Sequence, residues 1–264
     1  MRRPAPEGII NFADNARIVS EGAADMILRY TALLWQPSRD GGFAKRLGSG
    51  VFYTTNGRHF LITAAHCINP GNGLIKVGVT CNNSIHAIKG KVVMMHGKGR
   101  KLDVALIELE GKVLEFCLSQ YLFLTRQQLM LGPDMGEIKD YLVAGYPATG
   151  TSVSRGATKI TVKSLVYITV TLPLKEYKRA GFDPRNSILV GYNQRRSTYM
   201  DAPQRMNMAP DPAGVSGGGL WYIPSYFESS PRYFLAGIMT EHHKERNLMV
   251  ATKSGLIEAL TYMI

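Results

Sequence analysis

Short apolar segments, each closed by glycine, asparagine or proline, run through most of this chain and limit its fold more than any other feature. The segments are rich in Val, Ile, Leu, Tyr and Thr, which is typical of β-strands. About a dozen of them, without regular alternation with helices, favour an all-β barrel or sandwich. The expected strands are 27–35, 50–55, 59–65, 74–80, 89–95, 103–109, 141–147, 159–172, 187–193, 219–223, 233–239 and 247–253.

Local signals add a hairpin and a helix to this pattern. An Asn-Gly pair lies between the apolar runs 50–55 and 59–65, and this pair is the strongest short-range hairpin signal. Apolar residues at helical spacing behind a serine predict a C-terminal helix over 254–264. The segment 111–140 is ambiguous, and the polar, basic, proline-bearing segment 173–210 predicts long loops.

The size of the chain, 264 residues, allows one large all-β domain or two small lobes. Residues 1–25 are expected to form an N-terminal arm, with helical character between Asn11 and Met26. The first residues have no apolar stretch of the kind that a secretory signal needs. No run of 18 apolar residues occurs, so we expect no membrane span.

The cysteines are few and odd in number: Cys67, Cys81 and Cys117. This count predicts free, buried thiols and no disulfide framework. Together with the missing signal, it predicts a protein of a reducing compartment, the cytoplasm.

The net charge of +11 favours anionic partners in general. The basic residues are scattered, however, with modest clusters at 96–101 and at Arg195-Arg196. No aromatic side chains alternate with them in the manner of an RNA-binding surface. We therefore interpret the charge as a basic, solvated surface and do not expect nucleic acid as the partner.

Three short motifs carry residues that together perform nucleophilic catalysis. They read TAAHC, DVALIEL and GVSGG, and they contain His66, Asp103 and Ser216 in that order. A serine hydroxyl attacks well only when an imidazole accepts its proton, and the imidazole works best when a carboxylate orients it. Each of these residues alone more often has a structural role. All three together, each within its own characteristic short motif, indicate a hydrolase.

Other chemistries fit the sequence less well. The Gly-x-Ser-x-Gly string also fits an α/β-hydrolase, but that fold needs its acid and histidine after the serine, on a parallel sheet. Behind Ser216 stand Glu241 and His242 without such a pattern. No cysteine sits in a glycine-rich turn, so a cysteine nucleophile is not expected. His242 and His243 are adjacent and would point apart on a strand, so we expect no metal and no other cofactor.

The three motifs resemble those of the chymotrypsin-like (trypsin-fold) serine proteases, and YLVAGYP (141–147) and FLAGIM (234–239) are similar to core strands of the bacterial members. The resemblance covers roughly residues 45–264. It implies two six-stranded antiparallel β-barrels and a C-terminal helix in a peptidase domain over 26–264. Barrel one would span about 26–125, barrel two about 135–253, and the helix about 254–264.

The resemblance also implies the roles of the residues. Ser216 would be the nucleophile, His66 the general base and then the general acid, and Asp103 the carboxylate that orients His66. The backbone N–H groups of Gly214 and Ser216 would form the oxyanion hole, where a glycine lets the loop turn its N–H groups inward.

Two positions depart from the animal members of that family. Val215 stands where they carry an aspartate that pairs with a new N-terminal ammonium after zymogen cleavage. Valine cannot form that ion pair, so we expect no activation by N-terminal insertion. No cysteine lies near Leu47 to Phe52 to pair with Cys67, so Cys67 is expected to be a free thiol.

Specificity is less readable. Glu241 or Asp211 would attract a basic side chain, and Met249 would make the substrate pocket shallow. The resemblance implies that the pocket is formed by Pro210, Asp211, Thr240, Glu241, His242 and Met249.

The leading hypothesis is a serine endopeptidase that cleaves protein or peptide substrates through an acyl-enzyme. The alternative is a catalytically silent binding or scaffold module on the same fold, and a third hypothesis is a nucleic-acid-associated protein. A cytoplasmic protease needs restraint, and the N-terminal arm or a regulatory partner protein is the candidate for it.

Overall fold

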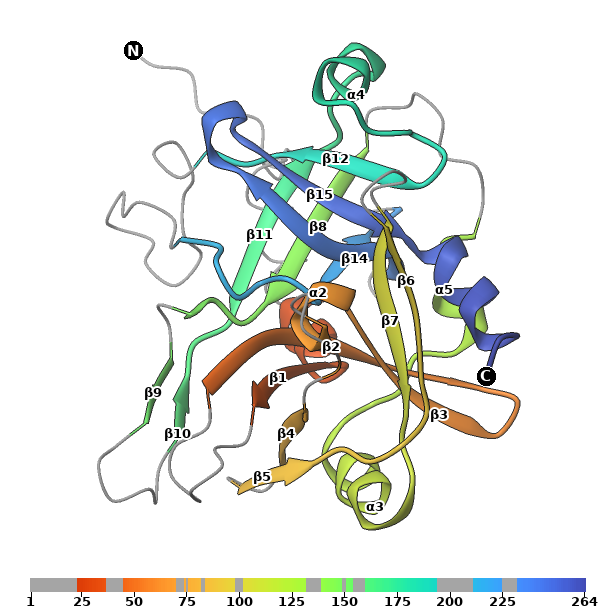
Figure 1. Cartoon of the computed structure of the whole chain (residues 1–264). Coiled ribbons are helices and arrows are strands. Elements are labelled where there is room, and N and C mark those ends of the chain that lie inside the picture. Colours follow the sequence, from red (N-terminus) through yellow and green to blue (C-terminus); the bar gives the residue numbers. More distant parts are fainter. Residues whose placement is uncertain are drawn as a thin grey trace, which may run out of the picture.

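Antiparallel β-sheet forms most of the described chain. The computed structural model describes residues 23–36, 45–69, 74, 76–81, 84–97, 102–131, 139–148, 151–153, 160–193, 211–224 and 232–264. Its strands form two large sheets and one short ribbon (Figure 1). All pairs of strands in them are antiparallel, so the expected all-β class is confirmed.

The first sheet has seven strands in the order β5-β4-β1-β2-β3-β7-β6. They are β1 (Thr31–Gln36), β2 (Lys45–Thr55), β3 (Arg58–Thr63), β4 (Gly78–Cys81), β5 (Ser84–Ala87), β6 (Val92–Gly97) and β7 (Leu102–Glu108). The expected hairpin joins β2 and β3. Its turn residues Asn56 and Gly57 have φ values of 51° and 72°, as a tight hairpin turn of the Asn-Gly type requires.

The second sheet has six strands in the order β11-β8-β13-β14-β15-β12. They are β8 (Asp140–Gly145), β11 (Leu165–Val170), β12 (Ser187–Gly191), β13 (Gly219–Tyr222), β14 (Phe234–His243) and β15 (Leu248–Lys253). The ribbon pairs β9 (Thr151–Val153) with β10 (Ile160–Val162). Thr171, just past β11, bridges to Val190 on β12, so the two edges of this sheet curl toward each other.

The first sheet has seven strands where six were expected, whereas the second has six, and the ribbon adds two more. The segment expected as one strand at 74–80 gives β4, and the polar residues behind it add β5 to the edge of the first sheet. The stretch 159–172 divides into β10 and β11. Closure of the two sheets into two barrels, and the domain limits drawn from it, stay predictions.

Helices are short and lie between or after the strands. They are α2 (Ala65–Ile68), α3 (Gly111–Gln120), α4 (Leu174–Ala180) and α5 (Ser254–Thr261), with 3₁₀ turns at Arg126–Gln128 and Lys244–Arg246. The expected C-terminal helix is confirmed as α5. The ambiguous segment 111–140 contains α3, and the expected loops of 173–210 contain α4 and β12.

The stretch 27–35 is only partly a strand. Residues 23–28 are helical, and β1 begins at Thr31. Ala23 and Ile27 lie one helical turn apart and are both buried, so packing against the core favours the helix there. Most of the N-terminal arm lies outside the described residues.

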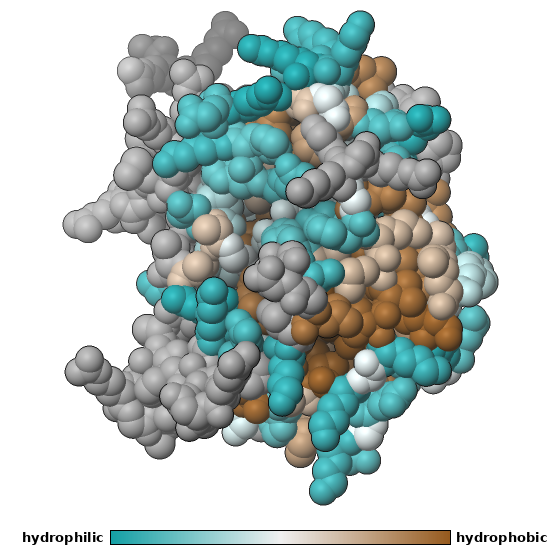
Figure 2. Space-filling view, viewed as in Figure 1, coloured by the Kyte–Doolittle hydropathy of each residue, from teal (hydrophilic) through white to brown (hydrophobic). Residues whose placement is uncertain are grey.

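One apolar cluster joins the two sheets. Tyr53 and Ile62 of the first sheet pack in it with Leu142 and Trp221 of the second, and Ile257 of α5 completes it. Seen from the same side as Figure 1, apolar surface gathers where β6, β7 and α5 lie (Figure 2). The cluster fixes the two sheets against each other, and it thereby fixes side chains that come from both.

Candidate active site

His66 lies on the single turn of α2, directly behind β3. Ala65, Cys67 and Ile68 are buried, which holds the turn against the first sheet. The His66 side chain is 42% exposed, so it points out of the apolar layer. Because its neighbours in the turn are apolar and buried, the polar ring of His66 is the side chain of this turn that lies at the surface.

Asp103, near the start of β7, holds both the ring and the backbone of His66. Its Oδ2 atom lies 2.5 Å from the Nδ1 atom of His66, and its Oδ1 atom accepts the His66 backbone N–H at 2.9 Å. The Asp103 side chain is only 12% exposed. One buried carboxylate therefore fixes both the position and the orientation of the imidazole.

The two side chains shift each other's proton affinity. The hydrogen bond that the His66 ring donates to Asp103, helped by Cys67 and opposed by burial, raises the pKa of His66 to about 10. Burial alone would raise the pKa of Asp103, but hydrogen bonds from His66 and the nearby His66 and His96 charges outweigh burial and lower that pKa. The arrangement favours a protonated imidazole beside an ionised carboxylate, which is the state reached when His66 accepts a proton.

Ser216 lies in a tight turn before β13. The Val215 N–H donates to the Pro212 carbonyl at 2.9 Å, and the Gly218 N–H donates to the Val215 carbonyl at 2.8 Å. The Ser216 carbonyl accepts the Ser49 N–H at 2.8 Å, which ties this turn to β2. Strands of both sheets therefore position Ser216.

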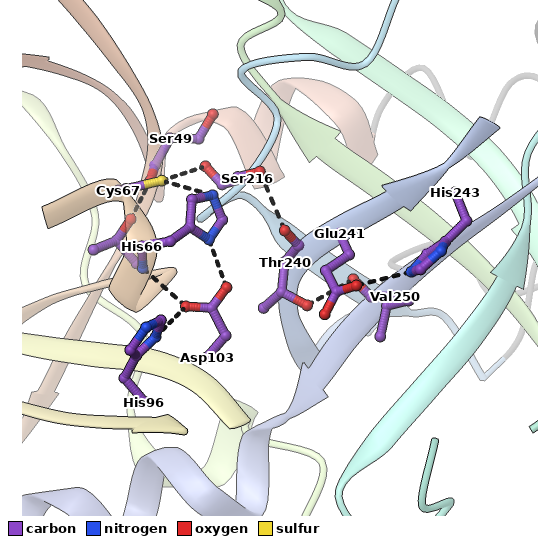
Figure 3. A network of polar contacts seen from close by, with 11 residues as sticks. Ser49, His66, Cys67, His96, Asp103, Ser216, Thr240, Glu241, His243 and Val250 are labelled. Carbon is purple, nitrogen blue, oxygen red and sulfur yellow. Dashed lines mark hydrogen bonds and ion pairs between the residues drawn. The ribbon is translucent and has the colours of Figure 1, made fainter. Parts of the chain in front are cut away.

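Cys67 links the histidine and serine parts of the site (Figure 3). Its Sγ atom lies 3.7 Å from the Nε2 atom of His66 and 3.7 Å from the Ser216 carbonyl oxygen. The Ser216 hydroxyl donates to the Thr240 carbonyl at 3.4 Å. Ser216 and His66 both lie in the part of the chain that the structure describes, and no hydrogen bond joins the Ser216 hydroxyl to the His66 ring.

The turn before Ser216 presents unpaired backbone donors. Gly214 has a φ of 95°, in the region that favours glycine. Within the described residues, the N–H groups of Gly214 and Ser216 donate to no acceptor. Neighbouring N–H groups of this kind form a concave donor pair suited to an anion.

The structure describes all of the expected pocket residues except one. Pro210 lies outside the described residues. Asp211 is exposed, and its Oδ1 atom accepts the Ala213 N–H at 3.0 Å. Thr240 is buried and donates to the Val250 carbonyl at 3.2 Å.

The remaining pocket candidates lie on β14 and β15. Glu241 is hydrogen bonded to the Nε2 atom of His243 at 2.8 Å, so its carboxylate already has a partner. The ring of His242 packs edge-on against Tyr192 at 5.4 Å. Met249, opposite His242 in the register, is 2% exposed and belongs to the core of the second sheet. A pocket formed by these residues stays a prediction.

Two contacts of the site were not predicted from the sequence. His96 faces Asp103 across the β6–β7 pair, and Ser49 donates its hydroxyl to the Gly214 carbonyl at 3.1 Å. The first could have been found from the sequence, because an antiparallel pairing of the neighbouring apolar segments before residue 98 and after residue 101 brings His96 opposite Asp103. The second joins residues far apart in the sequence and carries no local signal.

All three cysteines are free and buried, as expected. Cys81 and Cys117 lie with their sulfur atoms 3.8 Å apart.

No helix among the described residues has the length and apolar character needed to cross a membrane. No group of three or more His, Cys, Asp or Glu side chains within the described part of the chain is arranged to hold a metal ion.

Comparisons with known proteins give a likeness of fold. No family model matches the chain, and no curated protein matches its sequence. Among solved structures, the chain is similar to the crystal structure of the protease Anisep from Arthrobacter nicotinovorans, with a TM-score of 0.55 and 13% sequence identity. The match covers 91% of this chain and 97% of the other. At this identity the likeness shows a protease-like fold, and function has to be argued from the site.

Proposed function

We propose that this chain is a serine endopeptidase of the chymotrypsin-like type, acting on protein or peptide substrates. The observation that carries the proposal is the double contact between Asp103 and His66, at 2.5 Å and 2.9 Å. A buried carboxylate that fixes the tautomer and direction of an imidazole is the arrangement that activates a serine nucleophile. The likeness of the fold to a protease supports the proposal.

In this mechanism the Ser216 hydroxyl turns from the Thr240 carbonyl toward the Nε2 atom of His66 when substrate binds. Catalytic hydrogen bonds are often long or misaligned in the free enzyme, so the 3.4 Å contact with Thr240 is compatible with this step. His66 takes the hydroxyl proton while the oxygen attacks the carbonyl carbon of the peptide bond. Asp103 stabilises the resulting imidazolium.

The N–H groups of Gly214 and Ser216 would bind the oxyanion that develops on the attacked carbonyl. His66 then gives its proton to the leaving amine, and an ester joins the acyl group to Ser216. Water, deprotonated by His66, hydrolyses this ester and restores the free hydroxyl.

Three free thiols support the expectation that the protein works in a reducing compartment.

The test compares wild type with Ser216→Ala. We expect a fluorophosphonate probe to label the wild type and leave the variant unlabelled, and we expect cleavage of casein or a peptide library to fall by about 10⁴–10⁶-fold. Ser119→Ala is the matched control, because Ser119 is exposed on α3. Equal labelling of Ser216→Ala and wild type would refute the assignment.

A silent binding module is the second candidate, and the Thr240 contact of the Ser216 hydroxyl favours it. If the folded wild type neither reacts with the probe nor cleaves any peptide, this candidate replaces the first.

Removing residues 1–22 tests the expected restraint by the arm while leaving the buried Ala23 in place. Unchanged turnover after this deletion would dismiss the arm as the restraining element.

A further inference from the structure

A second histidine lies on the side of Asp103 away from the His66 ring. His96 stands on β6, the edge strand of the first sheet, directly opposite Asp103 in the register. The Nδ1 atom of His96 is 3.6 Å from the Oδ1 atom of Asp103. A dashed line marks this contact in Figure 3. This distance is too long for a good hydrogen bond but suits an ion pair.

The Asp103 carboxylate thus has a partner for each oxygen. Oδ2 meets the His66 ring, while Oδ1 accepts the His66 backbone N–H and faces His96. Rotation of the carboxyl group would weaken all of these contacts together. His96 therefore restrains the carboxylate that in turn orients His66.

Within the described part of the chain, few other charged groups face His96. From β7 it faces Asp103, and from α2 the His66 ring shares that carboxylate. The helix α5 also packs near β6, and its charged residue Glu258 is already paired with Arg126. The His96 side chain is 42% exposed, so water weakens its interaction with Asp103 without removing it.

We propose that His96 is a second positioning residue for Asp103, and that the charge of the side chain at position 96 acts through Asp103 on the pH at which His66 accepts a proton. The proposal rests on the serine endopeptidase function above. A cation at position 96 neutralises part of the Asp103 charge and leaves less of it to stabilise a protonated His66. An uncharged side chain there leaves the whole carboxylate charge to His66.

The test uses His96→Phe, which keeps a flat ring without charge, and His96→Lys, which supplies a permanent cation. The first measurement follows the His66 Nδ1 proton by NMR over a pH titration. We expect the midpoint in His96→Lys to lie about 0.5–1 pH unit below that in His96→Phe. This readout reports the Asp103–His66 pair and requires no hydrolysis.

The second measurement is the kinetics of peptide cleavage. We expect kcat in His96→Phe to fall about three- to tenfold because Asp103 loses a restraint. KM should stay unchanged, because the proposed role of His96 acts through Asp103 and not through a contact with substrate. His96→Lys should recover part of this loss above its own His66 midpoint. The matched controls are His86→Phe and His86→Lys, since His86 lies on β5 at the opposite edge of the same sheet.

Equal NMR midpoints in both His96 variants would overturn the proposal. A fall in kcat of the same size in the His86 variants would also overturn it, because a general loosening of the sheet would then be the cause. Failure of the endopeptidase function is distinguishable, since it would abolish cleavage in the wild type and leave the difference in NMR midpoints intact.

Discussion

The Nδ1 atom of His66 and the Oδ2 atom of Asp103 lie 2.5 Å apart, although 36 residues separate them in the sequence. The contact holds because α2 packs against β7 of the first sheet, and because Asp103 also accepts the His66 backbone N–H. With its side chain 12% exposed, Asp103 interacts with His66 in surroundings that screen charge poorly. The behaviour of the whole site with mutation and pH follows from this pair.

Replacing Asp103 by Asn is expected to lower kcat by about 10³–10⁴-fold. An amide keeps the shape of the carboxyl group, but it presents an N–H or a neutral oxygen and so favours the wrong tautomer of His66. Peptide cleavage at a fixed pH measures the effect, and circular dichroism checks that the variant folds. A variant within tenfold of the wild type would show that Asp103 does not orient a working base.

The pH dependence of activity follows from the raised pKa of His66, which reaches about 10. Only neutral His66 accepts the Ser216 proton, so kcat/KM should fall as pH drops through that pKa, about tenfold per pH unit below the midpoint. We expect the acid limb well above pH 6.5, the ordinary value for histidine. Asp103→Asn should move the residual acid limb toward this ordinary value, and an unmoved limb would contradict the assignment.

Stability should change with pH in the opposite sense. The folded-state pKa of His66 is raised, so the contact of protonated His66 with Asp103 stabilises the fold fully below pH 6.5. This contribution is lost as pH rises from 6.5 toward about 10. Thermal unfolding of wild type and His66→Asn measures it, and their difference in Tm should shrink over that interval. A constant difference would refute the linkage.

The sequence was sufficient for the residues whose signals are local. The alternating strands, the Asn-Gly hairpin and α5 all follow from short stretches of sequence, and so does the exposed ring of His66 after a buried run. The expected strand 27–35 was wrong at its start, because residues 27 and 28 continue a helix in which Ile27 is buried against the core. The contacts of Ser49 with the 214–218 turn depend on how two sheets dock, and no local pattern encodes that.

Replacing Gly217 by Ala should disrupt the turn that carries Ser216. The residue has a φ of 85°, and a Cβ atom there would lie 2.0 Å from the Ser49 carbonyl oxygen and 2.3 Å from Thr63 Oγ1. Either the turn moves or the link to β2 breaks, so we expect a loss of about 2–4 kcal/mol and of probe labelling.

Gly57→Ala is the matched control for this prediction. Gly57 also has a positive φ, of 72°, but a Cβ atom there meets nothing within 4 Å. We expect a cost of only about 1–2 kcal/mol, from the left-handed backbone alone, with unchanged probe labelling. Urea unfolding measures both variants, and equal losses would show that the close approach to Ser49 does not matter.

Replacing Val215 by Asp tests whether the aspartate of the animal proteases fits this chain. Val215 is fully buried and packs in the core of the second sheet with Leu220 and Met239. An aspartate there would be a buried charge, and we expect a loss of about 3–5 kcal/mol because no ammonium is supplied to pair with it. Val215→Ala, which leaves only a small cavity, should cost about 1–2 kcal/mol. If urea unfolding finds Val215→Asp as stable as Val215→Ala, the site accommodates a carboxylate, and the expected cost of burying this charge is wrong.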